Sequence, residues 1–252
     1  MNVFKFYNEG GWSERKKITK DAKLFEDLRT VAKEYVSLCR KKINNYIAKK
    51  GTHILDFASG PIQYKEYLEY SKNFKTRHCV DFSKDAINKA KIKLGRRGKY
   101  YCQDFKTIKF KKNFFDTIIS LHTIYHINKN KQANVVKKLI SISKKNAPII
   151  IIYSNPETII NKIKKFLSLK KKKHNNSLYF YCYKNEWWKQ FSNIADVKLY
   201  PWRSFASQHQ KKLFPNNIIG KYMFKILIIL ENKFPYFFTK YFQYLIIVLR
   251  KY

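Results

Sequence analysis

Cysteine is scarce in this chain of 252 residues, and its four copies are scattered. Cys39, Cys79, Cys102 and Cys182 form no Cys-x-x-Cys pair and show no cysteine and histidine spacing of a zinc site. The pattern excludes a disulfide framework and predicts reduced, mostly buried thiols in a cytoplasmic protein. We therefore expect no metal site.

Long apolar runs are also missing. The longest, at residues 226–230 and 245–249, fall far short of the roughly 20 residues that a membrane span requires. The first residues are not followed by a continuous apolar segment, so we expect no signal peptide. The sequence predicts a soluble, cytoplasmic protein that is at most peripheral to a membrane.

Acidic residues are few, with 17 Asp and Glu against 53 Lys and Arg and a formal net charge of +36. Such a charge attracts RNA, DNA or an anionic membrane surface. However, the excess is mostly lysine spread through every segment alongside abundant Ile, Asn, Phe and Tyr, a pattern that A/T-rich codon usage also produces. Both explanations stay open. With 45% hydrophobic and 17% aromatic residues, the chain should bury a real core.

The most informative stretch is residues 53–63, where a short apolar segment runs into a turn of small side chains. This pattern is typical of a buried parallel strand that ends where a ligand can touch the backbone. Ala58, Ser59 and Gly60 let the main chain approach a ligand closely, and Asp56 supplies an acceptor at the strand end.

This stretch resembles the first motif of the class I S-adenosylmethionine-dependent methyltransferases, a strand ending in Asp followed by D-x-G-x-G-x-G. Asp56 and Gly60 stand at the acidic position and the middle glycine, while Ala58 and Ile62 replace the other two glycines. We expect Ala58 to keep a negative φ, and Ile62 to change the path of the chain after Pro61. Alone, the loop is equally compatible with an ordinary strand-to-helix turn.

Two later strands also end in carboxylates. Asp81 closes the second strand about 25 residues beyond the first acid, the place from which nucleoside-binding α/β folds bind ribose hydroxyls. Asp104 and Phe105 follow the third strand; the resemblance implies that this carboxylate takes the adenine amino group and that the neighbouring apolar residue lies against the ring.

Residues 113–127 resemble the family's fourth-strand motif. The resemblance implies that Leu121 and His122 border the methionine end of the cofactor, with Tyr125 and His126 on the substrate side or packed beneath it. If the acceptor must lose a proton, His122, Tyr125 and His126 are the candidates for the base. A core or cofactor-packing role explains them equally well.

The resemblance covers residues 51–153 and implies an α/β fold, with a Rossmann-like, mostly parallel seven-stranded sheet, helices on both faces, an antiparallel last strand and a C-terminal helical insert. We expect one domain over 1–252, with an N-terminal lid and helix at 1–50, the cofactor-binding core at 51–153 and a substrate-side elaboration at 154–252. Periodicity predicts helices at about 22–48, 64–70, 84–94, 130–143 and 157–169, a loop at 170–176, and late strands at 177–183, 194–200 and 242–249.

The acceptor side is less determined. In the family, the segment before the leading helix often folds over the cofactor, and Tyr7 and Trp12 are the candidates for that lid. The insert at 201–241 is a substrate cover, a basic amphipathic hairpin on an anionic membrane, or scaffold. The candidate substrate residues are Trp12, Trp187, Trp188, Trp202, Arg203, which could hold a phosphate or carboxylate, and His209.

The leading hypothesis is an enzyme that methylates a small-molecule, sugar or lipid-linked acceptor on oxygen or nitrogen, with S-adenosylmethionine as cofactor. An RNA methyltransferase is an alternative, although no Asn-Pro-Pro-Tyr-like motif follows the fourth strand. A non-catalytic cofactor-binding or basic interaction protein is another. The predicted cofactor residues are Asp56, Ala58, Ser59, Gly60, Asp81, Phe82, Gln103, Asp104, Phe105, Leu121 and His122.

Overall fold

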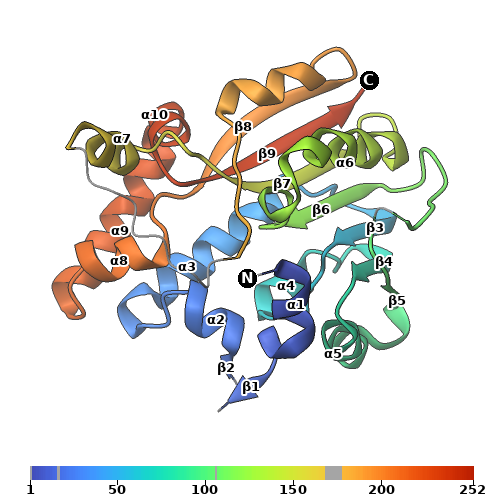
Figure 1. Ribbon diagram of the computed structural model, residues 1–252, viewed down its shortest axis with the longest axis horizontal. Coiled ribbons are helices and arrows are strands. Elements are labelled where there is room, and N and C mark those ends of the chain that lie inside the picture. Colours follow the sequence, from blue (N-terminus) through green and yellow to red (C-terminus); the bar gives the residue numbers. More distant parts are fainter. Residues whose placement is uncertain (1, 16–17, 106, 168–177) are drawn as a thin grey trace.

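The computed structural model describes residues 2–15, 18–105, 107–167 and 178–252. Its centre is a seven-stranded sheet in the order β5-β4-β3-β6-β7-β9-β8 (Figure 1). The first five of these pair in parallel, whereas β9 runs antiparallel to both β7 and β8. The predicted fold class, including the antiparallel last strand, is confirmed. The strands are β3 (Gly51–Phe57), β4 (Phe74–Asp81), β5 (Gly98–Cys102), β6 (Thr117–Leu121), β7 (Pro148–Ser154), β8 (Ala195–Arg203) and β9 (Tyr244–Lys251).

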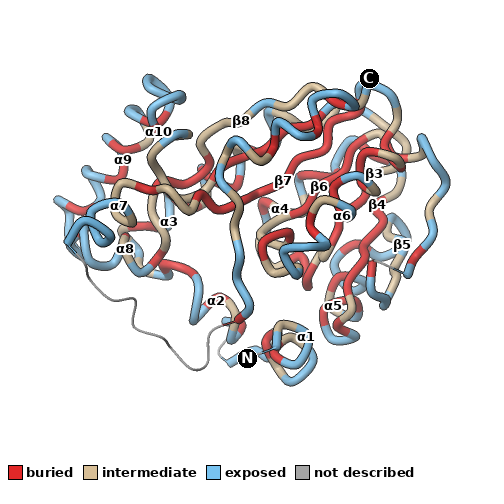
Figure 2. Tube along the Cα trace, turned by 45° about the horizontal axis from the view of Figure 1, so that its top comes forward, coloured by how far each residue is buried: buried red, intermediate tan, exposed pale blue. Residues whose placement is uncertain are grey.

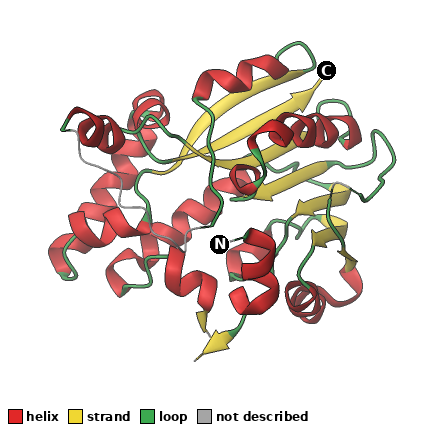
Figure 3. Cartoon of the chain, viewed as in Figure 1, coloured by secondary structure: helices red, strands yellow, loops and turns green. Residues whose placement is uncertain are grey.

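Helices cover both faces of this sheet (Figure 3). On one face α6 and η5 pack against β3, β6, β7 and β9; on the other, α3, α9 and α10 pack against the same strands. The helices and turns are α1 (Val3–Phe6), η1 (Tyr7–Gly11), α2 (Lys20–Phe25), α3 (Thr30–Lys41), η2 (Lys42–Asn45), α4 (Lys65–Glu69), α5 (Lys84–Leu94), η3 (Gly95–Arg97), η4 (Ile124–His126), α6 (Lys129–Ile142), α7 (Ile159–Phe166), η5 (Asn185–Phe191), α8 (Ser207–Leu213), α9 (Ile218–Lys233) and α10 (Pro235–Tyr241). Strands β1 (Glu14–Arg15) and β2 (Ile18–Thr19) form a small hairpin.

Burial explains why the central strands read as continuous apolar runs. Every residue of β7 is buried, and the buried parts of the chain follow the strands through the middle of the molecule (Figure 2). Strands covered on both faces need apolar side chains on both. The parallel arrangement also brings the carboxyl ends of β3, β4 and β6 to one edge of the sheet, where the candidate site lies.

The predicted helix at 22–48 is wrong in its continuity, because the chain leaves helical geometry between α2 and α3. Glu26 has extended backbone angles, φ −109° and ψ 152°. The Asp27 carboxylate accepts hydrogen bonds from the backbone N–H and the guanidinium of Arg29, which stabilises the break. The break lets α2 turn toward the carboxyl edge of the sheet and carry Asp21 and Glu26 into the candidate site.

The predicted strand at 177–183 is also wrong over its described part, since 178–183 form no ladder. Their backbone groups bond elsewhere: the Tyr181 N–H donates to the Tyr125 carbonyl, and the Tyr183 N–H donates to the Tyr153 hydroxyl. The predicted helix at 157–169 is described as far as residue 167 and ends at Phe166. The loop predicted at 170–176 lies outside the described residues.

Candidate cofactor and acceptor site

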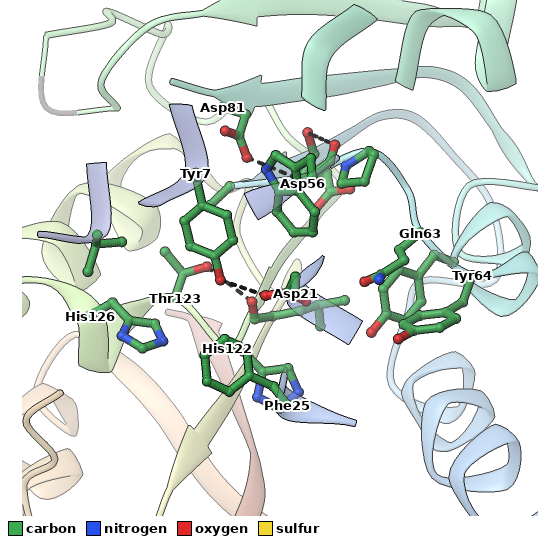
Figure 4. Close-up of a pocket in the computed structure, with 18 of the residues that line it drawn as sticks. Tyr7, Asp21, Phe25, Asp56, Gln63, Tyr64, Asp81, His122, Thr123 and His126 are labelled. Atoms are coloured by element: carbon green, nitrogen blue, oxygen red, sulfur yellow. Dashed lines mark hydrogen bonds between the residues drawn. The ribbon is translucent and has the colours of Figure 1, made fainter. Parts of the chain in front are cut away.

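A cavity of about 310 Å³ lies between the carboxyl ends of β3, β4 and β6 and the N-terminal segment of the chain (Figure 4). Its walls are mainly aromatic, with several carboxylates. The lining residues are Val3, Tyr7, Trp12, Asp21, Phe25, Glu26, Asp56, Ala58, Ser59, Gly60, Pro61, Gln63, Tyr64, Tyr67, Asp81, Phe82, Leu121, His122, Thr123, Tyr125, His126, Phe180, Arg203 and Tyr244.

The loop after β3 takes left-handed backbone angles at each position that the motif reserves for glycine. The φ angles are +56° at Ala58, +54° at Gly60 and +50° at Ile62. The prediction of a negative φ at Ala58 is therefore wrong. Hydrogen bonds from the Ser59 N–H to the Val80 carbonyl (3.1 Å) and from the Gly60 N–H to a side chain of β4 (2.9 Å) impose this path. The left-handed region costs a residue with a side chain about 1–2 kcal/mol.

Asp81 holds this loop in place. Its Oδ2 accepts the Gly60 N–H and its Oδ1 accepts the Ser83 N–H, both at 2.9 Å. Burial raises the pKa of Asp81 to about 6, although these backbone hydrogen bonds oppose the shift. Since a carboxylate has about four lone-pair sites, acceptor capacity remains for a ligand in the cavity.

Asp56 lines the same cavity but has a partner that the sequence did not reveal. Arg77 of β4 donates from Nε to Asp56 Oδ2 at 3.1 Å and also pairs with it through Nη2. Arg77 and Asp56 are 1% and 2% exposed, so this is a buried ion pair. The one signal in the sequence is an arginine within a segment, residues 74–81, that is read as a strand leading into the core.

The N-terminal segment, with Tyr7 and Trp12, packs over this loop, while their role as a lid over a cofactor stays a prediction. Their rings stack at 4.8 Å between centroids, and a Cβ built on Gly60 would lie 3.1 Å from the indole of Trp12. The Tyr7 hydroxyl donates to Asp21 Oδ1 at 2.9 Å (Figure 4). Ser83 Oγ donates to the Tyr7 carbonyl at 3.2 Å. Burial raises the pKa of Asp21 to about 6. The lid thus brings its own carboxylate to the cavity.

Two histidines border the cavity from the segment after β6. His122 has φ +59°, and its Nδ1 lies 2.7 Å from the Tyr125 hydroxyl. Its Nε2 is buried and has no hydrogen-bond partner among the described residues. His126 Nδ1 lies 2.7 Å from the Tyr179 carbonyl, which can only accept. His126 therefore carries its proton on Nδ1 when neutral, which leaves the Nε2 lone pair available.

Burial keeps both imidazoles neutral. It lowers the pKa of His122 well below its usual value, with a further contribution from the nearby Arg203 charge, and lowers the pKa of His126 as well. Arg203 reaches the cavity from the end of β8, but its charge is already matched, since its Nη1 donates to Glu26 Oε2 at 2.7 Å.

Several sequence candidates are not among the residues that line this cavity. Gln103, Asp104 and Phe105 are absent from the described lining, and Phe105 is buried with its ring 4.2 Å from that of Phe57. Trp187, Trp188 and Trp202 are also absent from it. Trp188 and Trp202 are 0% and 2% exposed, and the Trp187 ring stacks on that of Tyr183 at 4.7 Å, at the edge of the core. The roles given to these residues stay predictions.

His209 borders a second cavity of about 210 Å³, beside Thr158 and Phe205. Sequence reasoning missed site residues on α2 and just after it, in the segment from Pro61 to Tyr67, and at four scattered positions. They are Val3, Asp21, Phe25, Glu26, Pro61, Gln63, Tyr64, Tyr67, Thr123, Phe180 and Tyr244. Among the described residues, no group of three or more His, Cys, Asp or Glu is placed to hold a metal ion.

Comparisons with known proteins agree with this geometry. Residues 55–151 match a family model described as a methyltransferase domain. An uncharacterized protein of Methanocaldococcus jannaschii is 26% identical over 127 residues, which are 50% of this chain and 50% of the relative, so the match spans half of that protein's length.

Two solved structures illustrate the likeness in fold. A SAM-dependent methyltransferase from Archaeoglobus fulgidus superposes with a TM-score of 0.55 and 16% identity, over 86% of this chain and 94% of that chain. Phosphoethanolamine N-methyltransferase 2 of Haemonchus contortus, in complex with S-adenosyl-L-methionine, superposes with a TM-score of 0.51 and 15% identity, over 85% of this chain and 52% of that chain.

Proposed function

We propose that this chain, which contains a class I S-adenosylmethionine-dependent methyltransferase domain, transfers the cofactor's methyl group to an oxygen or nitrogen atom of a small acceptor in the cavity beneath the N-terminal lid. The finer features of this proposal are the size of the acceptor and the assignment of residues to cofactor and acceptor.

The observation that carries the proposal is the pair of carboxylates, Asp21 and Asp81, that face one cavity with pKa values raised to about 6 by burial. Within the described chain, hydroxyl and backbone N–H groups meet them, and no lysine or arginine forms an ion pair with either. Buried carboxylates of this kind favour a ligand that brings hydrogen-bond donors or positive charge. S-adenosylmethionine has ribose hydroxyls, an ammonium group and a sulfonium centre, so these residues fit it.

The cofactor residues are assigned on this basis. Asp81 accepts hydrogen bonds from the ribose hydroxyls, and the small side chains of Ala58, Ser59 and Gly60, with left-handed φ at Ala58 and Gly60, leave room for close approach. Leu121, His122, Phe82 and Asp56 border the remainder of the cofactor. Gln103, Asp104 and Phe105 stay proposed for the adenine end on the strength of the family resemblance alone.

The cofactor supplies an activated methyl group, so the chain has mainly to hold the acceptor atom in line with it and exclude water. Tyr7, Trp12 and Phe25 enclose the acceptor from the lid side. His126 receives the acceptor's proton on Nε2, because the Tyr179 carbonyl fixes the hydrogen of the neutral ring on Nδ1. A neutral ring is required for this role, which agrees with the lowered pKa of His126.

The net charge of +36 keeps an RNA acceptor under consideration. Against it, the described cavity lining includes Asp21 and Asp81, which form no ion pair among the described residues and repel a phosphate backbone when ionised, and the lid closes over the loop. The non-catalytic alternative rested on the two missing glycines. Since Ala58 and Ile62 still adopt left-handed angles, that reason for doubting cofactor binding is weaker.

A methyl-transfer assay tests the proposal. The purified protein is incubated with cofactor carrying a labelled methyl group and with a panel of amines, phosphoethanolamine, alcohols, sugars, lipid-linked sugars and total RNA. Phosphoethanolamine belongs in the panel because one structural relative is named for it. We expect label on a small acceptor and not on RNA. Label on RNA alone supports the alternative acceptor, and cofactor binding without transfer to any acceptor supports a non-catalytic protein.

A further inference from the structure

Helix α9 presents apolar side chains on two opposite faces. Its inner face packs on α3, where the ring of Phe224 stacks on that of Tyr35 at 5.0 Å and Glu231 accepts the Tyr35 hydroxyl hydrogen at 2.6 Å. Its outer face is formed by Ile219, Tyr222, Ile226 and Ile229, which are 59%, 59%, 55% and 62% exposed. These four residues recur at helical spacing, so they form one continuous stripe, called here the α9 stripe.

Exposed apolar residues extend the stripe into α10. Phe234, Tyr236 and Phe237 are 48%, 78% and 45% exposed at the turn between the two helices and in the first turn of α10. Both helices lie at one end of the molecule, away from α5 at the other end (Figure 1). Single exposed apolar residues need no explanation, but a contiguous row on one helix indicates an interaction surface.

The charged side chains of the segment that carries the stripe are almost all positive. Between residues 207 and 241 the sequence has six lysines (Lys211, Lys212, Lys221, Lys225, Lys233 and Lys240) and a single acidic residue, Glu231. Glu231 is 0% exposed and forms an ion pair with Lys42 of η2. The surface of this region is therefore apolar and cationic with no exposed carboxylate.

We propose that the α9 stripe docks the protein on the surface of an anionic lipid bilayer. Isoleucine and aromatic side chains enter the boundary between headgroups and acyl chains, while Lys221 and Lys225 at the margin of the stripe contact anionic headgroups. None of the described helices is long and apolar enough to cross a membrane, so the helix lies on the surface. This inference does not depend on the proposed acceptor.

The charge distribution distinguishes this occupant from two others. A second copy of the chain brings another +36 and another lysine-rimmed stripe, and such like charges repel. RNA offers phosphates to the lysines but leaves the apolar centre of the stripe without a partner. An anionic bilayer offers charged headgroups to the lysines and an apolar interior to the centre of the stripe.

The test is flotation of the full-length protein with phosphatidylcholine vesicles, with and without phosphatidylglycerol, at moderate and high salt. The test variant is Ile226→Asn with Ile229→Asn. The matched control is Ile92→Asn on α5, since Ile92 is 83% exposed but lies far from the stripe. We expect the double variant to lower affinity for anionic vesicles by about tenfold or more, and each of Lys221→Ala and Lys225→Ala to lower it by about fivefold.

Because all of these side chains are largely exposed, far-UV circular dichroism and the melting temperature should not change, which separates loss of docking from loss of folding. Residual binding of the double variant to anionic vesicles should be lost at a lower salt concentration than binding of the control. Equal binding by the double variant and the control would overturn the proposal, as would equal binding to neutral vesicles. So would a wild-type protein that ignores vesicles but dimerises through α9 in sedimentation velocity.

Discussion

The buried pair of Asp56 and Arg77 makes the strongest prediction about stability. Arg77 donates through two of its nitrogens to Asp56 Oδ2, and its Nη1 also donates to the Tyr67 carbonyl. Both side chains are almost fully excluded from solvent. Asp56→Leu should therefore leave the Arg77 charge buried without a counterion. Arg77→Met should likewise leave the Asp56 carboxylate buried without a counterion.

Removal of one partner from a buried ion pair typically costs about 3–5 kcal/mol. Each single variant should lose that much of a total stability of roughly 5–15 kcal/mol. The double variant, Asp56→Leu with Arg77→Met, removes both charges and keeps apolar volume. Its free energy of unfolding should be only about 1–2 kcal/mol below that of the wild type. This remaining loss is the cost of leaving the buried Tyr67 carbonyl without its hydrogen-bond donor.

Urea denaturation followed by circular dichroism measures these free energies, at low temperature so that the single variants stay folded. With these losses, the coupling free energy between the two sites is at least about 4 kcal/mol. Additive losses in the double variant would refute the reasoning. They would mean that each group is stabilised by the rest of the protein and not by its partner.

Three further predictions follow from the same site. Gly60→Ala should lower the free energy of unfolding in a denaturation experiment, because Gly60 has φ +54° and a Cβ there would lie 3.1 Å from the lid tryptophan. Burial raises the pKa values of Asp21 and Asp81 to about 6, above the unfolded value of about 3.9. Their contribution to stability is therefore complete below pH 3.9 and should fall as the pH rises to 6. Asp21→Asn should make the melting temperature less dependent on pH in this range. His126→Ala should lower kcat by about 10²-fold or more with little change in cofactor affinity, whereas an unchanged kcat would remove the histidine from proton transfer.

The core of the fold could be predicted from sequence because its signals are local. The apolar runs that end in Asp56 and Asp81 correspond to β3 and β4, and the capped segment from Lys84 to Leu94 is α5 to the residue. Ser83 accepts the Ala86 N–H at 3.3 Å, as an N-cap does. Strand ends and helix caps depend on neighbours in sequence, so they can be read without the tertiary structure.

What could not be predicted depends on partners distant in sequence. Ala58 adopts a left-handed φ because β4 supplies the acceptors for the loop, which local preference does not anticipate. The residues at 178–183 have strand propensity. Their backbone groups nevertheless bond to side chains of α6 and β7, such as Gln132 and Tyr153, and not to a neighbouring strand. The apolar residues of the insert at 201–241 were compatible with several roles until the structure separated the inner face of α9 from its outer stripe.

The central claim is that the cavity beneath the lid binds S-adenosylmethionine through Asp81. The most direct test is calorimetric titration of the cofactor into the wild-type protein, Asp81→Asn and the control Asp196→Asn, whose carboxylate lies on β8 outside the described cavity lining. We predict saturable binding by the wild type and the control, and affinity about tenfold to a hundredfold lower for Asp81→Asn, the loss expected for hydrogen bonds to a charged group. Undiminished affinity in Asp81→Asn, or no binding by the wild type, would contradict the account.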